Sequence, residues 1–232
     1  IAEKQLLVSD STIIVGRAGE SDTLLKVSGF VIDEGPSRLL SYQLSADRMA
    51  VKELSTYWPS GIPSTTRSWV LERSKEGILT NIEFDNEIRL QKKKGSKVEK
   101  IREFISLDFD GLSLQLYRKL EPILQAKGRI QIIDGHIDVT AKDAVVENVL
   151  VTEATVVISP NQGQTKHLNS SMMLACEAKV CMSLLNKIGL KSPGFLRLKE
   201  QIQSGQVLSS VNFAMPLPKL NSGSEPPEKI NM

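Results

Sequence analysis

The stretch ILTNIEFDNEIRL, residues 78–90, decides the fold class of this chain. Apolar and charged side chains alternate along it, which is the period of two that an extended backbone gives to its two faces. We therefore predict a long β-strand with one apolar face and one wet face. The apolar face would carry Ile78, Thr80, Ile82, Phe84, Asn86, Ile88 and Leu90, and the wet face Glu83, Asp85, Glu87 and Arg89.

Similar patterns lie on both sides of this stretch. Residues 5–56 contain three strand-like segments, two of them separated by the turn signal Glu34-Gly35-Pro36-Ser37. Downstream, residues 104–116 alternate again and lose phase at Gly111, a candidate bulge. Asp134-Gly135 between two Ile-rich arms predicts a two-residue hairpin. Since most connections have hairpin length, the predicted fold class is mainly β, with a mostly antiparallel sheet.

Two short helices interrupt the strands. In YWPSGIPSTTRSWVLERSKEG, residues 57–77, Ser64 is a candidate N-cap, and Gly77 a candidate stop. The second helix is expected over residues 178–188 and closes near Gly189. We expect each helix to cap or plug the sheet, because uncovered apolar surface and an open sheet edge favour aggregation.

The composition excludes some classes of protein. The 232 residues are 41% hydrophobic and 24% charged, as in a globular chain, and the net charge of +2 argues against a nucleic-acid partner. No run of about 18 apolar residues and no signal peptide is present. The chain begins at Ile1 without Met, so we interpret it as a piece of a longer protein; residues 221–232 resemble a linker.

Few residues suggest catalysis. His136 has Asp138 and Asp143 nearby in sequence, and a histidine with two carboxylates could in principle transfer protons. No nucleophile motif, phosphate loop or metal-ligand cluster accompanies them, so a solvated hairpin histidine is the better interpretation. His167 lies in a polar loop and is interpreted likewise. We predict no enzyme activity, cofactor or metal.

The two cysteines, Cys176 and Cys181, leave two alternatives open. They are small buried apolar residues, or they form a disulfide in an oxidising compartment. Together with two distant histidines they have no recognisable zinc-site spacing.

The helical stretch also carries a family resemblance. Tyr57-Trp58-Pro59, Pro63, Arg67-Ser68-Trp69-Val70 and Gly77, followed by an amphipathic strand, resemble a signature of the AsmA-like envelope proteins of Gram-negative bacteria, in particular the YhdP-like branch. The strands of residues 135–159 and the helix and strand that follow are similar to later parts of that family. The resemblance covers residues 24–220. The short loop 60–62, the basic turn 92–100 and the cysteines depart from it.

The resemblance implies a fold, a place and a function. The family has a curved antiparallel sheet that forms an open apolar groove on the periplasmic side of the inner membrane, anchored by a helix outside this segment. The groove is thought to carry phospholipid between the inner and outer membranes, which supports outer-membrane integrity. Residues 1–220 would then be a segment of such a groove, with phospholipid acyl chains as partners.

The candidate groove residues are the apolar members of the alternating strands. For each one, ordinary packing in a closed core is the alternative, and for the whole chain a β-rich interaction module is the alternative. The groove candidates are Ile82, Phe84, Ile88, Leu107, Phe109, Ile137, Val139, Val156, Ile158, Val211 and Phe213, and the structural cap would comprise Tyr57, Trp58, Pro59, Trp69 and Val70.

Overall fold

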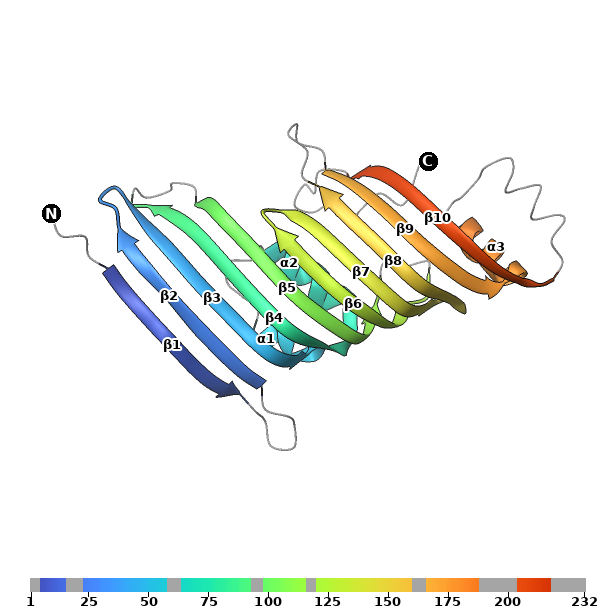
Figure 1. Cartoon of the computed structure of the whole chain (residues 1–232), viewed down its shortest axis with the longest axis horizontal. Helices are drawn as coiled ribbons and strands as arrows, with labels where there is room; N and C mark the ends of the chain where they lie inside the picture. The colour runs from blue at the N-terminus through green and yellow to red at the C-terminus, as the bar shows by residue number, and fades with distance from the viewer. Residues whose placement is uncertain are drawn as a thin grey trace. The chain divides into compact units, whose positions relative to one another are not determined.

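The protein is mainly β in a computed structural model (Figure 1). Within the residues that the structure describes, ten strands belong to one antiparallel sheet, in which the spatial order β1 to β10 is the sequence order. This confirms the predicted mainly-β, antiparallel class with a few short helices. The structure describes residues 5–15, 23–57, 64–92, 98–115, 120–159, 166–187 and 204–217.

The strands are long, and turns of two or three residues join β2 to β3, β6 to β7 and β7 to β8. Their bounds are β1 Gln5–Val15, β2 Thr23–Asp33, β3 Ser37–Ala50, β4 Ser74–Gln91, β5 Glu99–Leu114, β6 Ile123–Ile133, β7 His136–Val146, β8 Val149–Ser159, β9 Lys166–Glu177 and β10 Gln206–Leu217.

The helices are short. A 3₁₀ turn (Val51–Glu53) and α1 (Leu54–Tyr57) follow β3, where the sequence predicted a strand through residue 54. Glu53 accounts for this difference, because its carboxylate accepts a hydrogen bond from the backbone N–H of Ala50 (2.9 Å). That bond satisfies one of the N–H groups left unpaired at a helix start. The helix expected over 178–188 is confirmed as α3 (Ala178–Lys187).

Gly77 does not end a helix. α2 (Ser64–Arg73) ends four residues earlier, and Gly77 lies inside β4 with φ of 130°. A Cβ at this position would approach the Cα of Leu112 in β5 to 2.9 Å. Glycine is therefore needed here for the close approach of two strands and for the backbone conformation. The predicted N-cap role of Ser64 lies outside what the structure describes of its side chain.

The chain divides into two compact units, each of which combines segments distant in sequence. Unit 1 holds β1, β2, nearly all of β3 and most of β4 and β5, while unit 2 holds the helices and nearly all of β7 to β10. Their bounds are Ile1–Met49, Leu79–Asp108 and Ile130–His136 for unit 1, and Ala50–Ile78, Phe109–Arg129 and Ile137–Met232 for unit 2.

Two hairpin turns have the same backbone conformation. Asp134 and Gly135 have φ of 50° and 80°, so both lie in the left-handed region that a type I′ turn requires, and the predicted hairpin is confirmed. Glu147 and Asn148 have φ of 51° and 63° and join β7 to β8 in the same way. Glu147-Asn148 lacks the glycine that marks the first turn, and so it was not predicted from the sequence, although asparagine tolerates the left-handed region.

The alternation in β4 changes phase at Asn81. This residue has φ of 50°, and Leu79 rather than Ile78 is buried before it. The prediction that Ile78 and Thr80 continue the apolar face of Phe84 is therefore wrong. Gly111, the predicted bulge in β5, also has a left-handed φ, of 65°.

Candidate functional site

In unit 2, strand register brings the predicted groove residues together on one face. Val139 in β7 lies opposite Val156 in β8, and Ile137 lies opposite Ile158. Residues directly opposite each other in an antiparallel pair share a face, so these four side chains form one patch. The register of β8 with β9 and of β9 with β10 extends the patch across Leu168, Ser170, Met172 and Leu174 in β9 and Val207 and Val211 in β10.

This patch, the unit 2 apolar face, is only partly covered. Val139, Val156, Met172 and Val211 are half-buried. Every described strand belongs to the single sheet, so no second sheet from the described ranges lies over this face. Phe213 occupies the register position opposite Ser170, and its side chain lies outside the described part. The face therefore differs from the core of a sandwich, in which two sheets bury their inner sides.

A bulge in β8 keeps the apolar residues on this face. The register of β8 against β9 shifts between Val151 and Glu153. On either side of the shift, Val151 pairs with Leu174 and Ala154 pairs with Met172. Leu174 and Met172 are two positions apart in β9 and so share a face, and the bulge places Val151 on that same face.

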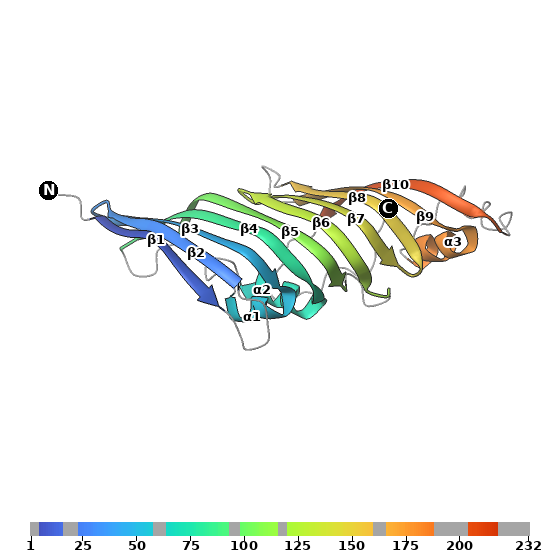
Figure 2. The same ribbon diagram turned by 60° about the horizontal axis from the view of Figure 1, so that its bottom comes forward.

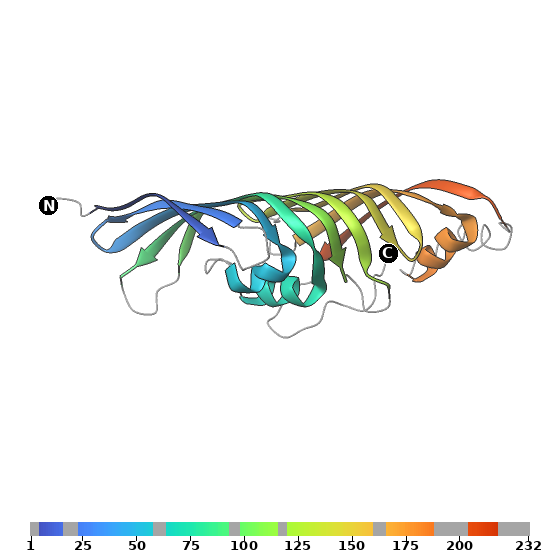
Figure 3. The ribbon, with the colours of Figure 1, turned by 90° about the horizontal axis from the view of Figure 1, so that it is seen from below.

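Helix α3 lies beside the end of β9 (Figure 2), and its bond to Cys176 places it on the face that also carries Leu174. Cys176, at the end of β9, forms a disulfide with Cys181 in α3, and both cysteines are also buried, so the two interpretations of these residues apply together. The apolar side of α3 buries Ala178, Cys181, Leu184 and Leu185, and the helix contacts β8, β9 and β10. The predicted covering role of this helix agrees with its position against the strands (Figure 3).

The groove candidates of unit 1 have a different environment. Phe84 is 3% exposed and packs its ring against Tyr42, with centroids 5.5 Å apart. Asn86, two positions along β4, donates its amide to the Tyr42 hydroxyl (2.9 Å) and is fully buried. Phe84 is therefore a core residue, whereas Ile82, Ile88 and Leu107 are half-buried. A charge at Phe84 would disrupt packing and could not report on lipid alone.

Phe109 belongs to unit 2 and is also buried, at 5% exposure. It lies beside Gly128 of β6, where an added Cβ would stand 2.7 Å from Cζ of the Phe109 ring. Of the eleven groove candidates, Phe84 and Phe109 thus have closed environments.

The opposite faces of the two units are polar in different ways. In unit 1, Asp85 accepts from Gln43 (3.2 Å) and pairs with Arg102, and Asn81 donates to Asp108 (2.7 Å). In unit 2, this side carries a shallow depression of about 470 Å³ on β8–β10. The charged residues Asp138, Lys142 and Glu153 occupy register positions of the same face in β7 and β8. The lining of the depression is uncharged and comprises Thr155, Val157, Asn169, Ser171, Asn212 and Ala214 from this face, together with Ser170, whose register position is on the apolar face.

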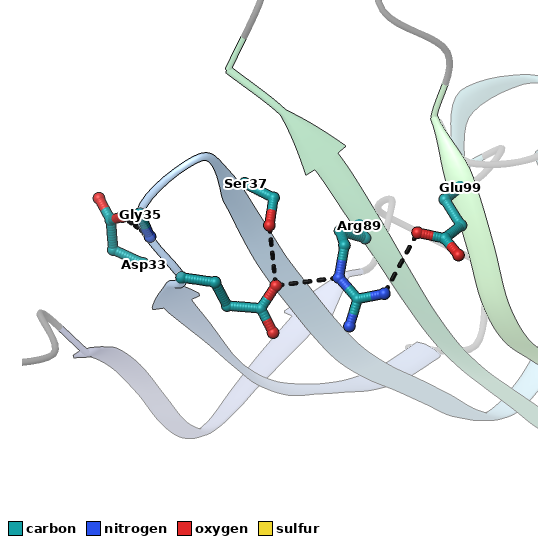
Figure 4. A network of polar contacts seen from close by, with 6 residues as sticks. Asp33, Gly35, Ser37, Arg89 and Glu99 are labelled. Carbon is teal, nitrogen blue, oxygen red and sulfur yellow. Dashed lines mark hydrogen bonds and ion pairs between the residues drawn. The ribbon is translucent and has the colours of Figure 1, made fainter.

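A charged network joins the β2–β3 turn to β4 and β5 in unit 1 (Figure 4). Glu34 accepts from Nε of Arg89 and from Oγ of Ser37, both at 2.9 Å, and Arg89 also pairs with Glu99 (3.2 Å). The hydrogen bond from Arg89 has the largest effect on Glu34 and that from Ser37 the next largest, and together they hold the pKa of Glu34 below its usual value. Lys92 and the N–H of Gly35 similarly lower the pKa of Asp33.

The network predicts a pH-dependent effect of Glu34→Gln. A lowered carboxyl pKa stabilises the folded state above the unfolded value, 4.5 for glutamate, and this stability is lost as pH falls through the lowered pKa. Glu34→Gln should therefore lower the urea midpoint at pH 7 and have little effect at about pH 3. Glu83→Gln, at an exposed position of β4, is the control. Equal pH profiles of the two variants would contradict the assignment.

The remaining predicted residues are dispersed. Tyr57 and Val70 are half-buried, in α1 and α2, while Trp58, Pro59 and the side chain of Trp69 lie outside the described part. His136 is half-buried rather than solvated, at the start of β7, and His167 is exposed.

No helix within the described ranges is long and apolar enough to cross a bilayer. No group of three metal-binding side chains occurs in the same part of the chain. A scan against models of protein families, a search of curated proteins and a search of solved structures all found no match to this chain.

Proposed function

We propose that this chain is a segment of a periplasmic, AsmA-like bridge protein that carries phospholipid between inner and outer membranes, with its membrane anchor outside the segment. The observation that supports the proposal is the unit 2 apolar face: side chains from four strands lie half-buried on one side of the sheet. The other side presents hydroxyl and amide groups together with Val157 and Ala214, and β7 and β8 add the charged residues Asp138, Lys142 and Glu153. This asymmetry suits a surface that contacts acyl chains on one side and water on the other.

The energetics of such contact favour a sheet face without specific ligand groups. Burial of one methylene contributes about 0.8 kcal/mol, so about ten methylenes contribute about 8 kcal/mol before the costs of association. Because this term depends on area and not on direction, a lipid could shift along the face without losing a defined set of hydrogen bonds. A transfer surface needs this combination of adequate affinity and low positional specificity.

A second candidate, a non-enzymatic interaction or scaffold module with a closed core, is favoured by a different observation. Phe84 and Phe109 are buried by protein, as core residues are. The two candidates differ in what covers Val156 and Val211. In the module these residues would contact another protein, and in the transfer protein they would contact lipid.

Lipid bound to the purified chain tests the proposal. The 232-residue chain, produced in the periplasm of a Gram-negative host and purified without detergent, should carry phospholipid that native mass spectrometry detects. It should also speed the transfer of a fluorescent phospholipid between donor and acceptor vesicles. A chain that carries no lipid and transfers none would overturn the proposal and favour the interaction module.

A further inference from the structure

Helix α3 is fastened to the unit 2 apolar face at three points. At its first residue, the N–H of Ala178 donates to the carbonyl oxygen of Gly205 (2.8 Å). One turn later, Cys181 is bonded to Cys176 of β9, with a Cα–Cα distance of 5.8 Å. The end of the helix is held separately by an ion pair.

This ion pair joins Lys187, the last residue of α3, to Glu147 in the β7–β8 turn, at 2.6 Å. Glu147 also accepts from the backbone N–H of Glu121 (3.1 Å). The hydrogen bond from the Lys187 ammonium and, with a smaller effect, that from the Glu121 N–H hold the pKa of Glu147 below its usual value. The carboxylate therefore stays ionised at neutral pH and keeps the end of the helix over the turn.

The residues at the α3 end of the face are the most buried part of this apolar surface. Val149 is 0% and Leu174 is 1% exposed, and Val151 beside them is also buried. Further along the same face, Val156 and Met172 are half-buried. Cys176, two positions from Leu174 in β9, carries the disulfide and so marks the covered side of the sheet.

A helix of this length depends on its attachments. α3 has ten residues, and isolated helices shorter than about 12–15 residues are marginal in water. Only one side of α3 packs on the sheet, and its buried residues are Ala178, Cys181, Leu184 and Leu185. The disulfide is the covalent attachment among the three, and it holds the helix at its first turn, next to the strand from which it starts.

We propose that α3 is a disulfide-latched cover over the end of the unit 2 apolar face, and that reduction of Cys176–Cys181 uncovers a further apolar binding surface around Val149, Val151 and Leu174. That this surface would receive an acyl chain rests on the proposed function; the latch itself does not. The inference assigns α3 a conformational role beyond the closure of a sheet end.

The opening step is a two-electron exchange with a dithiol. A thiolate of the dithiol attacks one sulfur of the disulfide, forms a mixed disulfide with it and releases the other cysteine as a thiolate, which takes up a proton. The second thiol of the dithiol then attacks the mixed disulfide, loses its proton, and leaves a cyclic disulfide and a second cysteine thiol. Because Cys176 and Cys181 are 6% and 3% exposed, exchange should require local opening of α3 and be slow.

Hydrogen exchange of the whole chain tests the latch. Oxidised protein, protein reduced with dithiothreitol, and the variant Cys176→Ala/Cys181→Ala would be compared by mass spectrometry, with thiol counts verifying each state. Amides 182–187 of α3 should exchange at least about tenfold faster in the reduced protein and in the variant, with β2 and β3 unchanged. Binding of an apolar fluorescent dye should increase in parallel. Dithiothreitol added to the variant is the matched control and should change nothing.

Three results would overturn the latch. These are unchanged exchange in α3, an equal increase of exchange in all strands, which would make the disulfide a general stabiliser, or an effect of dithiothreitol on the variant.

A measurement of phospholipid binding in both redox states separates this inference from the proposed function. Loosening of α3 with no binding of a fluorescent phospholipid in either redox state would support the latch and contradict lipid transfer, whereas lipid binding with unchanged α3 exchange would contradict the latch alone.

Discussion

The double variant Val156→Asp/Val211→Asp is expected to lose bound phospholipid, because both positions lie on the unit 2 apolar face. An acyl chain seated there would have to remove water from two carboxylates, which costs several kcal/mol for each buried charge. Since about 1.4 kcal/mol corresponds to a factor of ten, lipid occupancy should fall more than about tenfold. Native mass spectrometry and vesicle transfer would measure the loss.

The matched control places the same charges on the other face. Thr155 and Asn212 are the sequence neighbours of Val156 and Val211, and both line the depression on the other face of the sheet. Thr155→Asp/Asn212→Asp changes the net charge by the same two units in the same two strands. It should retain lipid, and both variants should keep the far-UV circular dichroism of the parent. Equal lipid loss in the two variants would count against a one-sided apolar surface.

Gly128→Ala should be the most destabilising single-methyl addition in unit 2. The new Cβ would collide with the carbonyl oxygen of Thr140 and would come within 2.7 Å of Cζ of Phe109 and 2.9 Å of Cα of Ala141. Two of these three atoms are backbone, so strands β6 and β7 would have to separate. We expect a loss of about 3 kcal/mol in the free energy of unfolding, at the upper end for overpacking, measured by urea denaturation.

Gly135→Ala is the control for this substitution. Nothing lies within 4 Å of a Cβ at Gly135, but its φ of 80° is unfavourable for alanine. The expected cost is about 1 kcal/mol, from the left-handed conformation alone. Both changes replace glycine by alanine, so their effects on the unfolded chain are alike. A Gly128→Ala variant no less stable than Gly135→Ala would show that β6 and β7 can adjust to the added methyl group.

Several structural features were readable from the sequence because they depend on neighbours along the chain. The alternation in residues 82–90 predicted β4, Asp134-Gly135 predicted a turn with two left-handed residues, and the pattern around Cys181 predicted α3. The positions at which the side-chain alternation shifts within a strand were harder to predict from the sequence. Asn81, Gln125 and Asp143 adopt positive φ inside strands, and their side chains give only a weak local signal for this conformation. Only the pairing with adjacent strands makes it favourable.

The disulfide and the burial of individual residues also depend on the tertiary structure. Cys181 is five positions after Cys176, and their bonding depends on α3 turning back onto β9 immediately after the strand ends. Phe84 and Val156 have similar positions in alternating strands, yet one is buried and the other half-buried. Periodicity assigns each of them to a face of the sheet and contains no information about what covers that face.

The sequence by itself determined the strands, their hairpin order and the amphipathic character of the sheet, because these follow from backbone geometry and from side chains a few residues apart. The tertiary structure decided which part of the apolar surface is closed by α3 and by the Tyr42–Phe84 contact, and which part remains half-exposed in unit 2. The physical reason is that burial is a property of pairs of surfaces, and the second surface comes from residues that are distant along the chain.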